Sequence, residues 1–227
     1  DFHPGDGGIP IGSAVLTEGF IIPEAVGSDI HCGMRLHTIE ATMDDWRRVK
    51  APLVERLHGD YLLGTRDVVL DARILRALFL DGLEGFGDAA LQHGLHGRLA
   101  QSDLHRVVEE LDQTTLSHAR LPKGDLAWVP EGLAPESGMV RDPGLGTVGS
   151  GNHFIELQVI EEVFDPKRAY DLRLYKGRLA FMIHSGSRHV GKHVGSLWKR
   201  KAMDAWPKGE KFPNGRIFPL MAGPLAD

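Results

Sequence analysis

Cysteine is almost absent from this sequence: Cys32 is the only one among 227 residues. A lone thiol cannot form an intramolecular disulfide, which leaves it the roles of a small buried apolar side chain, a nucleophile or a metal ligand. With one cysteine and no signal peptide at its start, the chain is expected in the cytoplasm.

The sequence also lacks long apolar runs, low-complexity stretches, internal repeats and an excess of positive charge. No apolar run is long enough to cross a membrane, so we expect no membrane partner. The formal net charge of −5 gives no overall attraction to nucleic acid, so any phosphate binding must be local. Since no linker divides the chain, we expect one domain over residues 1–227. We also expect a fragment, because the chain starts without Met and stops in apolar sequence.

The hydrophobic spacing predicts a mixture of helices and strands. A capping-box pattern at residues 42–45 predicts a helix over about 43–58, and Ser102 precedes a second helix over about 103–119. Several glycines between short apolar runs predict shorter helices and loops over 60–97. The expected strands are 26–39, interrupted at Gly33, then 152–164 and 178–184, and a last helix extends to about 206. This pattern indicates the α+β class.

Three segments that are far apart in the sequence carry the side chains best suited to chemistry. Asp29 precedes Cys32 by three positions, His153 follows a glycine-rich stretch, and His184 precedes Ser185-Gly186-Ser187-Arg188. A carboxylate, a thiol and imidazoles are ligands that Mn²⁺ or Zn²⁺ accepts. Each residue alone also has a structural interpretation, as a turn aspartate, a buried cysteine or a histidine bonded to a backbone carbonyl.

The segment around His184 has the order strand, glycine loop, helix. Such a loop presents backbone N–H groups and a helix N-terminus to an anion, and Arg188 adds a planar charged group suited to phosphate. The alternative is a core histidine beside an ordinary turn. The remaining basic residues near the motifs are interpreted as surface residues, as supports for ligands or as contacts to an RNA backbone: His31, His189, His193 and the run Lys199-Arg200-Lys201.

Taken together, four blocks resemble the RtcB family of RNA-splicing and RNA-repair ligases. They occur in the family's order, and they are Asp1-Phe2-His3-Pro4-Gly5 with Gly8-Ile9-Pro10-Ile11-Gly12, Val26-Gly27-Ser28-Asp29-Ile30-His31-Cys32-Gly33-Met34, Gly146-Thr147-Val148-Gly149-Ser150-Gly151-Asn152-His153-Phe154-Ile155-Glu156 and His184-Ser185-Gly186-Ser187-Arg188. The last two blocks are very specific. The departures are small: His31 stands where the family usually has Gly or Asn, Ser150 replaces a Gly, and His189-Val190 follows the arginine where a Gly is common.

The resemblance implies a mixed sheet and helix fold of the α+β class with a central metal site, in a partial RtcB-like catalytic domain over residues 1–227. It implies a ligase that joins an RNA 3′-phosphate or 2′,3′-cyclic phosphate to a 5′-hydroxyl, with GTP and Mn²⁺, in tRNA splicing or RNA repair. Two metal ions are implied, with Zn²⁺ as a substitute. Asp29, Cys32 and His153 resemble the ligands of one ion. Cys32 with His184 resemble those of the other, an arrangement that can neutralise phosphate oxygens during in-line transfer.

The same resemblance implies roles for further residues. Asn152, Phe154 and Glu156 match the family's guanine-nucleotide contacts. Arg188 matches a position near the RNA or its phosphate, and Asp1 matches an aspartate that assists the metals. A further metal-binding histidine and the histidine that becomes guanylylated belong to a C-terminal part of the family that these blocks do not match. The 227 residues alone are therefore expected to be inactive, and an archease-like activator is an implied partner.

Two other functions stay open at this point. One is a metal- and RNA-phosphate-binding remnant that lacks the nucleophile. The other is a dimetal phosphoesterase, since the same ligands are able to activate water. A covalent GMP adduct on histidine distinguishes the ligase from both, and phosphate release without an adduct indicates the esterase.

Overall fold

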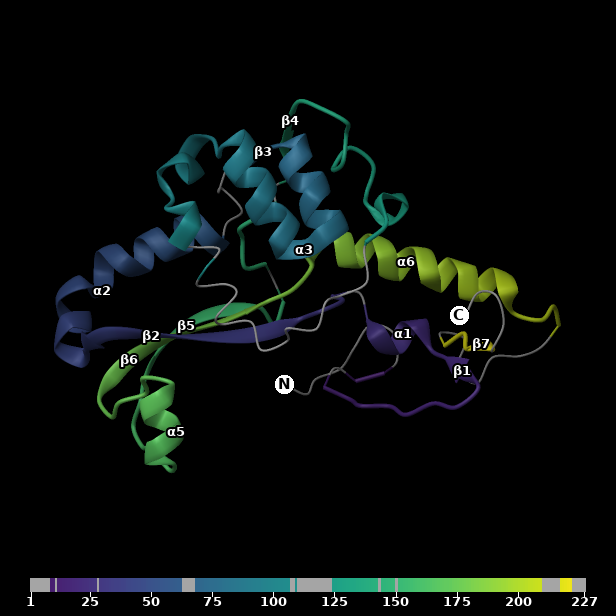
Figure 1. The fold of residues 1–227 in the computed structure, drawn as a ribbon. Coiled ribbons are helices and arrows are strands. Elements are labelled where there is room, and N and C mark those ends of the chain that lie inside the picture. The colour runs from purple at the N-terminus through teal and green to yellow at the C-terminus, as the bar shows by residue number, and fades with distance from the viewer. Residues whose placement is uncertain are drawn as a thin grey trace. The chain divides into compact units, whose positions relative to one another are not determined.

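A computed structural model describes the chain at residues 9–10, 12–27, 29–62, 68–106, 109, 124–142, 144–149, 151–209 and 217–221. The described residues form helices and strands in mixed order, which confirms the expected α+β class (Figure 1). The chain divides into two compact units. The first comprises Asp1–Cys32, Trp128–Pro130 and Gly186–Asp227, and the second comprises Gly33–Ala127 and Glu131–Ser185. Each unit is thus assembled from segments that are distant in sequence.

The second unit contains a three-stranded antiparallel sheet in the order β2-β6-β5. Its strands are β2 (Gly33–Thr42), β5 (Phe154–Val159) and β6 (Arg178–Ser185). The prediction for β6 is confirmed. The strand predicted over 152–164 is shorter, because the chain leaves the sheet after Val159 and enters α5 (Pro166–Asp171). Asp165 caps that helix by accepting a hydrogen bond of 3.0 Å from the backbone N–H of Arg168.

The strand predicted over 26–39 was wrong at its start. Residues before Gly33 form α1 (Pro23–Val26) and a turn, and β2 continues to Thr42. Pro23 favours this outcome because its fixed φ suits the first position of a helix. Gly27 then ends the helix with a φ of +79°, a conformation that glycine adopts without steric cost.

The predicted helix after β2 is confirmed as α2 (Met43–Leu57), which turns back from the end of the strand (Figure 1). Its capping box forms as expected. The carboxylate of Asp45 accepts hydrogen bonds of 2.8 Å from both the backbone N–H and the hydroxyl of Thr42. These bonds satisfy polar groups that a helix start leaves without an intrahelical partner.

The stretch 60–97 forms longer elements than the short helices and loops that were expected. A π-helical turn, His58–Leu62, precedes β3 (Val69–Asp71) and the long helix α3 (Ala72–His93), followed by the 3-10 helix Gly97–Gln101. Two of the glycines that suggested loops lie inside α3 instead. Gly82 forms a kink with a φ of +68°, and a Cβ at Gly85 would lie 2.7 Å from the carbonyl oxygen of Ala77.

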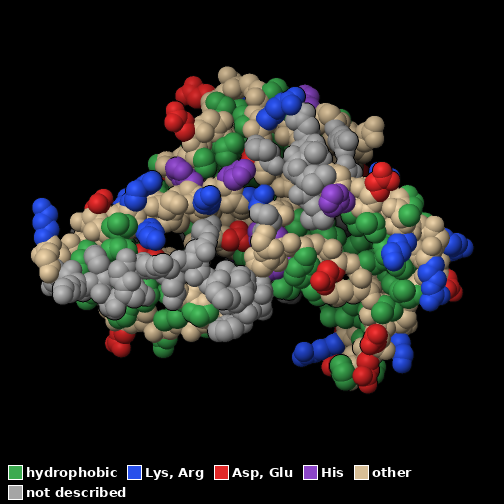
Figure 2. All heavy atoms as spheres, turned by 180° about the vertical axis from the view of Figure 1, so that it is seen from behind, with side chains coloured by type: hydrophobic (Ala, Val, Ile, Leu, Met, Phe, Trp, Pro, Cys, Tyr) green, Lys and Arg blue, Asp and Glu red, His purple; other side chains and the backbone are tan. Residues whose placement is uncertain are grey.

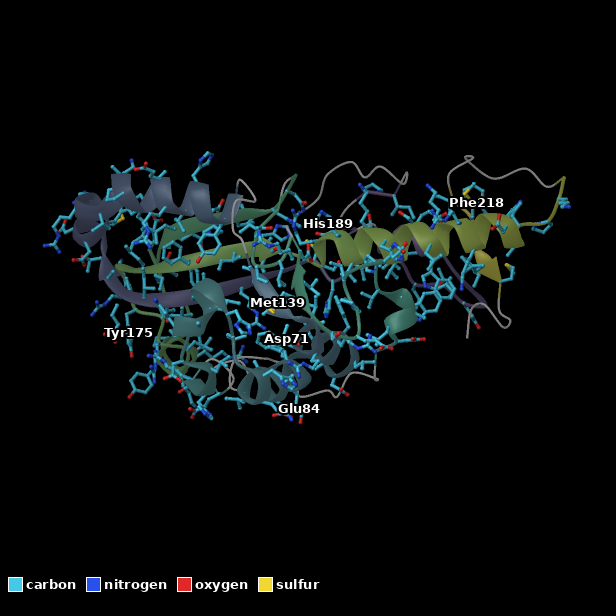
Figure 3. The ribbon with its side chains drawn as sticks, turned by 90° about the horizontal axis from the view of Figure 1, so that it is seen from above. Asp71, Glu84, Met139, Tyr175, His189 and Phe218 are labelled. Carbon is cyan, nitrogen blue, oxygen red and sulfur yellow. The ribbon has the colours of Figure 1, made fainter. Side chains whose placement is uncertain are left out.

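Strand β3 pairs with β4 (Met139–Arg141), so Asp71 lies opposite Met139 (Figure 3). The core of this unit forms around that pair and the start of α3, from Val68, Leu70, Ala72, Leu75 and Val140. The helix predicted over 103–119 lies mostly outside the described residues, of which 104–106 and 109 are helical.

In the first unit the predicted last helix is confirmed as α6 (Arg188–Ala205), and α1 packs against it. The short strands β1 (Phe20–Ile21) and β7 (Leu220–Met221) pair in antiparallel fashion. A small core of Ala202, Phe218 and Leu220 packs against Trp198 and Trp206. The 3-10 turn Leu126–Trp128 ends at the first residue of the short segment that belongs to this unit. Among the described helices, none is long and apolar enough to cross a membrane.

Candidate metal centre

The sheet register gathers the predicted site residues at one end of β6. His184 is opposite Phe154 on β5 and opposite Met34 on β2, so the starts of both edge strands lie beside it. Opposite residues of an antiparallel pair point to the same face, and the rings of Phe154 and His184 meet edge to face with centroids 5.2 Å apart. The side chain of His184 is buried, with 4% exposed.

Cys32, His153 and His184 form a cluster in which one ligand atom from each lies within 4.8 Å of the others. Cys32 immediately precedes Gly33, which is paired with Ser185, and His153 immediately precedes Phe154. Burial decreases across the cluster, from the buried His184 through the half-buried His153 to the exposed Cys32. The cluster is therefore anchored at the histidines and accessible at the thiol.

His153 reaches this cluster because β5 starts one residue after it. In a strand extending over 152–164, alternation would put His153 on the face opposite to Phe154 and His184. Instead residues 151–152 form a turn in which Gly151 has a φ of +78°. The ring of His153 then lies 5.4 Å from that of His184, centroid to centroid, at an interplanar angle of 61°.

Asp29, the fourth predicted ligand, does not belong to the cluster of three. A turn connects it to the thiol residue, since the backbone N–H of Cys32 donates a 3.2 Å hydrogen bond to the carbonyl oxygen of Asp29. Its half-buried carboxylate lies against the backbone of Gly186, where a Cβ would approach the Cγ atom to 2.7 Å. Glycine at position 186 thus leaves the space that the carboxylate occupies.

The loop after β6 is held at several points. The hydroxyl of Ser185 donates a 2.8 Å hydrogen bond to the carbonyl oxygen of Val148. A Cβ at the buried Gly191 would lie 3.0 Å from the backbone nitrogen of Ile30, so the turn before Cys32 packs closely on the first turns of α6. Within the described residues, the buried Oγ of Ser187 and Nε of Arg188 have no hydrogen-bond partner. Arg188 also has a φ of +52°, which is unusual for a side chain of this size.

The residues predicted to contact a guanine nucleotide are close to this cluster in the sheet. Phe154 and Glu156 share the face of His184 and Met182, because they are opposite those residues in the register. The exposed Glu156 accepts a 3.0 Å hydrogen bond from the side-chain amide of Gln158. Asn152 lies in the turn before β5, and Asp1 lies outside the described residues.

The donor set decides which ions suit the cluster. One thiolate and two imidazoles are typical of Zn²⁺, whereas Mn²⁺ prefers oxygen donors, which the carboxylate of Asp29 would add. Ligand bonds of about 2.0–2.3 Å in a tetrahedral site put two donors of one ion about 3.3–3.8 Å apart. The three donors lie within 4.8 Å of one another, so binding one ion would draw the most widely separated of them together by about 1 Å.

Two glycines position this site: Gly186 was predicted only as part of the loop after His184, and Gly191 was not identified from the sequence. Their role depends on the close approach of residues 29–30, which are distant in sequence. The only sequence signal was the density of glycine after a strand, and that pattern also occurs in ordinary turns.

Comparison of the sequence with known proteins gives a match along nearly the whole chain. Residues 1–222 match the family model described as tRNA-splicing ligase RtcB. The chain is 34% identical over 202 residues to the tRNA-splicing ligase RtcB of Archaeoglobus fulgidus, covering 86% of this chain and 37% of that protein. It is 31% identical over 206 residues to the same ligase of Thermococcus kodakarensis, covering 88% and 39% respectively.

A third relative extends the match along the whole chain. The tRNA-splicing ligase RtcB of Pyrobaculum aerophilum is 29% identical over 247 aligned positions, which cover 100% of this chain and 44% of that protein. The chain therefore spans less than half the length of the curated relatives it matches. The specific blocks, their order and the match over nearly every residue lead to one conclusion: the chain belongs to the RtcB family.

Proposed function

We propose that this protein at its full length is an RNA ligase of tRNA splicing or RNA repair, which joins an RNA 3′-phosphate or 2′,3′-cyclic phosphate to a 5′-hydroxyl with GTP and divalent metal, whereas the 227 residues alone are expected to be inactive. The observation that carries the proposal is the cluster of Cys32, His153 and His184 at one end of the sheet, in a chain of the RtcB family. A thiol and two imidazoles that converge from separate segments are unusual unless they bind a metal.

We assign Cys32, His153 and His184 as ligands of a divalent ion, with Asp29 completing the set. Mn²⁺ is the proposed ion, with Zn²⁺ as the substitute, and Cys32 would serve as a ligand in both positions of a two-ion site. A bound divalent ion would supply Lewis-acid stabilisation to phosphate oxygens. The backbone N–H of Cys32 donates a hydrogen bond to the carbonyl oxygen of Asp29, which keeps this residue within a short turn of the thiol and supports it as the fourth ligand.

We assign Asn152, Phe154 and Glu156 to the guanine nucleotide. Phe154 offers an aromatic edge beside His184, and the exposed carboxylate of Glu156 is an acceptor suited to the N–H groups of guanine. Both residues share the face of His184, so a nucleotide bound by them would lie beside the metal ligands.

Arg188 and Ser187 are assigned to the phosphate at the RNA end. Their buried Nε and Oγ atoms have no partner among the described residues, and buried donors of this kind usually bind a ligand or a water molecule in the working protein.

Asp1 is proposed to assist the metals, and an archease-like activator is a proposed partner. A thiolate ligand needs a reducing compartment, which supports the cytoplasm as the place of action.

Ligation of two synthetic RNA strands tests this function. One strand ends in a 2′,3′-cyclic phosphate or a 3′-phosphate and the other begins with a 5′-hydroxyl, and the purified full-length protein is supplied with Mn²⁺ and either GTP or ATP. We expect a joined product with GTP, none with ATP, and none from Cys32→Ser. The variant His37→Asn, at an exposed position of β2, serves as the matched control and should ligate normally.

Intact-mass measurement of the full-length protein after incubation with GTP and Mn²⁺ separates the alternatives. A GMP adduct on histidine supports the ligase. Phosphate release without an adduct would replace the ligase by a phosphoesterase. Metal and RNA binding without either product would make the protein a binding remnant, contrary to the proposal.

A further inference from the structure

Gln158 holds the carboxylate of Glu156, one of the residues assigned to the guanine nucleotide. Both side chains leave the same face of β5, because residues two positions apart in a strand point to the same side. The side-chain amide of Gln158 donates a hydrogen bond of 3.0 Å to Oε2 of Glu156. A hydrogen bond to a carboxylate is charge-assisted and roughly twice as strong as one between neutral groups. The contact therefore limits the directions in which the carboxylate points.

The neighbouring strand holds Gln158 in turn. Gln158 is opposite Ala180 on β6, and Glu156 is opposite Met182. Because Ala180 is small, the longer side chain of Gln158 has room to lie toward Met182, its diagonal neighbour. The Nε2 atom of Gln158 lies 3.7 Å from the sulfur of Met182, which is a weak acceptor. Gln158 is half-buried and Glu156 is exposed, so the better-packed side chain supports the more accessible one.

Only contacts to the base distinguish GTP from ATP. The two nucleotides carry the same triphosphate, so metal ions and charged side chains act equally on both. Figure 2 shows basic and acidic side chains scattered over one face of the molecule, and charges of either sign give no preference for a base. Guanine presents two donors side by side, N1–H and the N2 amine, whereas adenine has an acceptor at N1. A carboxylate only accepts hydrogen bonds, so it suits guanine and repels the N1 lone pair of adenine.

We propose that Gln158 is a positioning residue that sets base selectivity, by orienting the Glu156 carboxylate toward both N–H groups of guanine. The inference rests on the proposed function for the assignment of Glu156 to the base. A carboxylate offers about four acceptor positions on its two oxygens, so the one that Gln158 uses leaves others on both oxygens. Fixing the carboxylate beforehand lowers the entropy lost when the base binds. Orientation matters most for a base with two donors, because a freely rotating carboxylate meets one donor more readily than two.

Inosine triphosphate separates orientation from general binding, because its base has the N1–H of guanine but lacks the N2 amine. Single-turnover formation of the nucleotide adduct on histidine is measured with the full-length protein and Mn²⁺, across concentrations of GTP and of inosine triphosphate. We expect Gln158→Leu to raise the half-saturating concentration of GTP by about fivefold, which corresponds to the net loss of one hydrogen bond. The value for inosine triphosphate should rise by less than about twofold. The maximum rate should stay unchanged, since the metal ligands and the phosphates are not affected.

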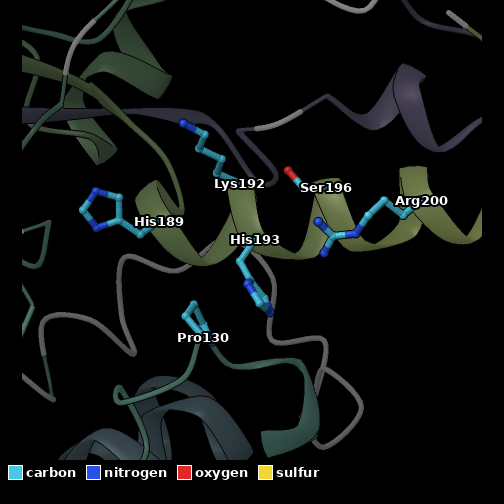
Figure 4. A pocket seen from close by; sticks show the side chains of 6 residues that line it. All are labelled: Pro130, His189, Lys192, His193, Ser196 and Arg200. Carbon is cyan, nitrogen blue, oxygen red and sulfur yellow. The ribbon is translucent and has the colours of Figure 1, made fainter.

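Three variants accompany Gln158→Leu. Gln92→Leu removes the same amide at an exposed position of α3 and should affect neither nucleotide. Ser196→Ala removes a polar group from a hollow along α6, in the other compact unit, and should be equally silent (Figure 4). Gln158→Glu replaces the donor by a second carboxylate, and the repulsion of like charges should raise the half-saturating GTP concentration at least as much as Gln158→Leu does. Urea unfolding checks that all variants fold.

Equal losses with GTP and inosine triphosphate in Gln158→Leu would overturn the proposal, because Gln158 would then support the strand and not the direction of the carboxylate. An unchanged dependence on GTP would overturn it as well. Either result, with normal adduct formation by the unmodified protein, would reject the role of Gln158 and retain the ligase.

Equilibrium dialysis of both nucleotides with the same variants measures binding without the chemistry. If the fivefold difference appeared in dialysis while the unmodified full-length protein formed no adduct, the ligase would be rejected and the role of Gln158 retained. Absence of both GTP binding and the adduct in the unmodified full-length protein would reject both.

Discussion

The rings of His153 and His184 meet edge to face with their centroids 5.4 Å apart, although one residue precedes an edge strand and the other lies in the central strand. Two features of the chain produce this approach. The register puts Phe154 opposite His184, and the turn at Gly151 frees His153 from the alternation of the strand. The candidate metal centre is therefore a consequence of where β5 begins.

Removing the buried member of this pair should abolish metal binding. We expect His184→Asn to weaken Mn²⁺ or Zn²⁺ binding by more than about 100-fold, since residues that merely support ligands already contribute up to that factor. Elemental analysis after gel filtration measures the bound metal, and the exposed His37→Asn is the control. Because His184 is buried and its loss also affects folding, Cys32→Ser provides an exposed second variant. Full metal occupancy in the serine variant would mean that Cys32 is not a ligand.

The start of α3 should make stability depend on acid pH. The carboxylate of Asp71 accepts hydrogen bonds from the backbone N–H and the side chain of Arg73, at 2.9 Å for both the backbone nitrogen and Nε, and this holds the pKa of Asp71 well below its usual range. A lowered pKa in the folded state stabilises the protein above the ordinary value near 3.8, and this contribution is lost as the pH falls below it.

We expect Asp71→Asn to reduce the loss of stability between neutral pH and about pH 3, and Asp71→Ala to cost about 1 kcal/mol at neutral pH through loss of the helix cap. Urea unfolding across that pH range measures both effects. Asp88→Asn, at an exposed position in the middle of the same helix, should leave the pH dependence unchanged. Equal pH dependence in Asp71→Asn and the unmodified protein would contradict the assignment.

Local sequence patterns predicted the elements whose signals are local. The capping box of α2, the alternation in β6 and the helical spacing of α6 each depend on neighbours within a few residues, and all three elements formed as expected. One prediction failed because a distant contact decides: the strand expected before Gly33 is replaced by a helix that packs on α6. The glycines of α3 suggested loops, but Gly82 forms a kink within the helix and Gly85 permits the close approach of Ala77 across it.

The residues of the candidate site were also predicted from local motifs, whereas their approach in space was not. The sequence identified Cys32, His153 and His184 by their motifs, and the sheet register that gathers them could not be read from any one segment. The position of Asp29 was beyond prediction, because it depends on the space left by Gly186 in a loop far along the chain.

His31 is strained in the turn that carries Cys32. Its φ of +67° lies in the left-handed region, which costs a side chain with a Cβ about 1–2 kcal/mol. We expect His31→Gly to raise stability toward urea by up to about 1 kcal/mol, after the entropy of glycine is offset. The same substitution in β2, His37→Gly, should lower stability, because that residue is extended and gains no relief. A loss of stability in His31→Gly would show that the histidine compensates its strain through contacts.

The packing of Asp29 on Gly186 should appear as a strong coupling between the two positions. A Cβ at residue 186 would crowd the carboxylate, with 2.7 Å to its Cγ, so we expect Gly186→Ala to cost about 1–3 kcal/mol in urea unfolding. Gly59→Ala is the control, since a Cβ at Gly59 meets nothing within 4 Å. In the background Asp29→Ala the carboxylate is gone, and Gly186→Ala should then cost clearly less than in the unmodified protein. A double-mutant cycle measures that difference, and additive costs would mean that the crowding at Gly186 is relieved without moving Asp29.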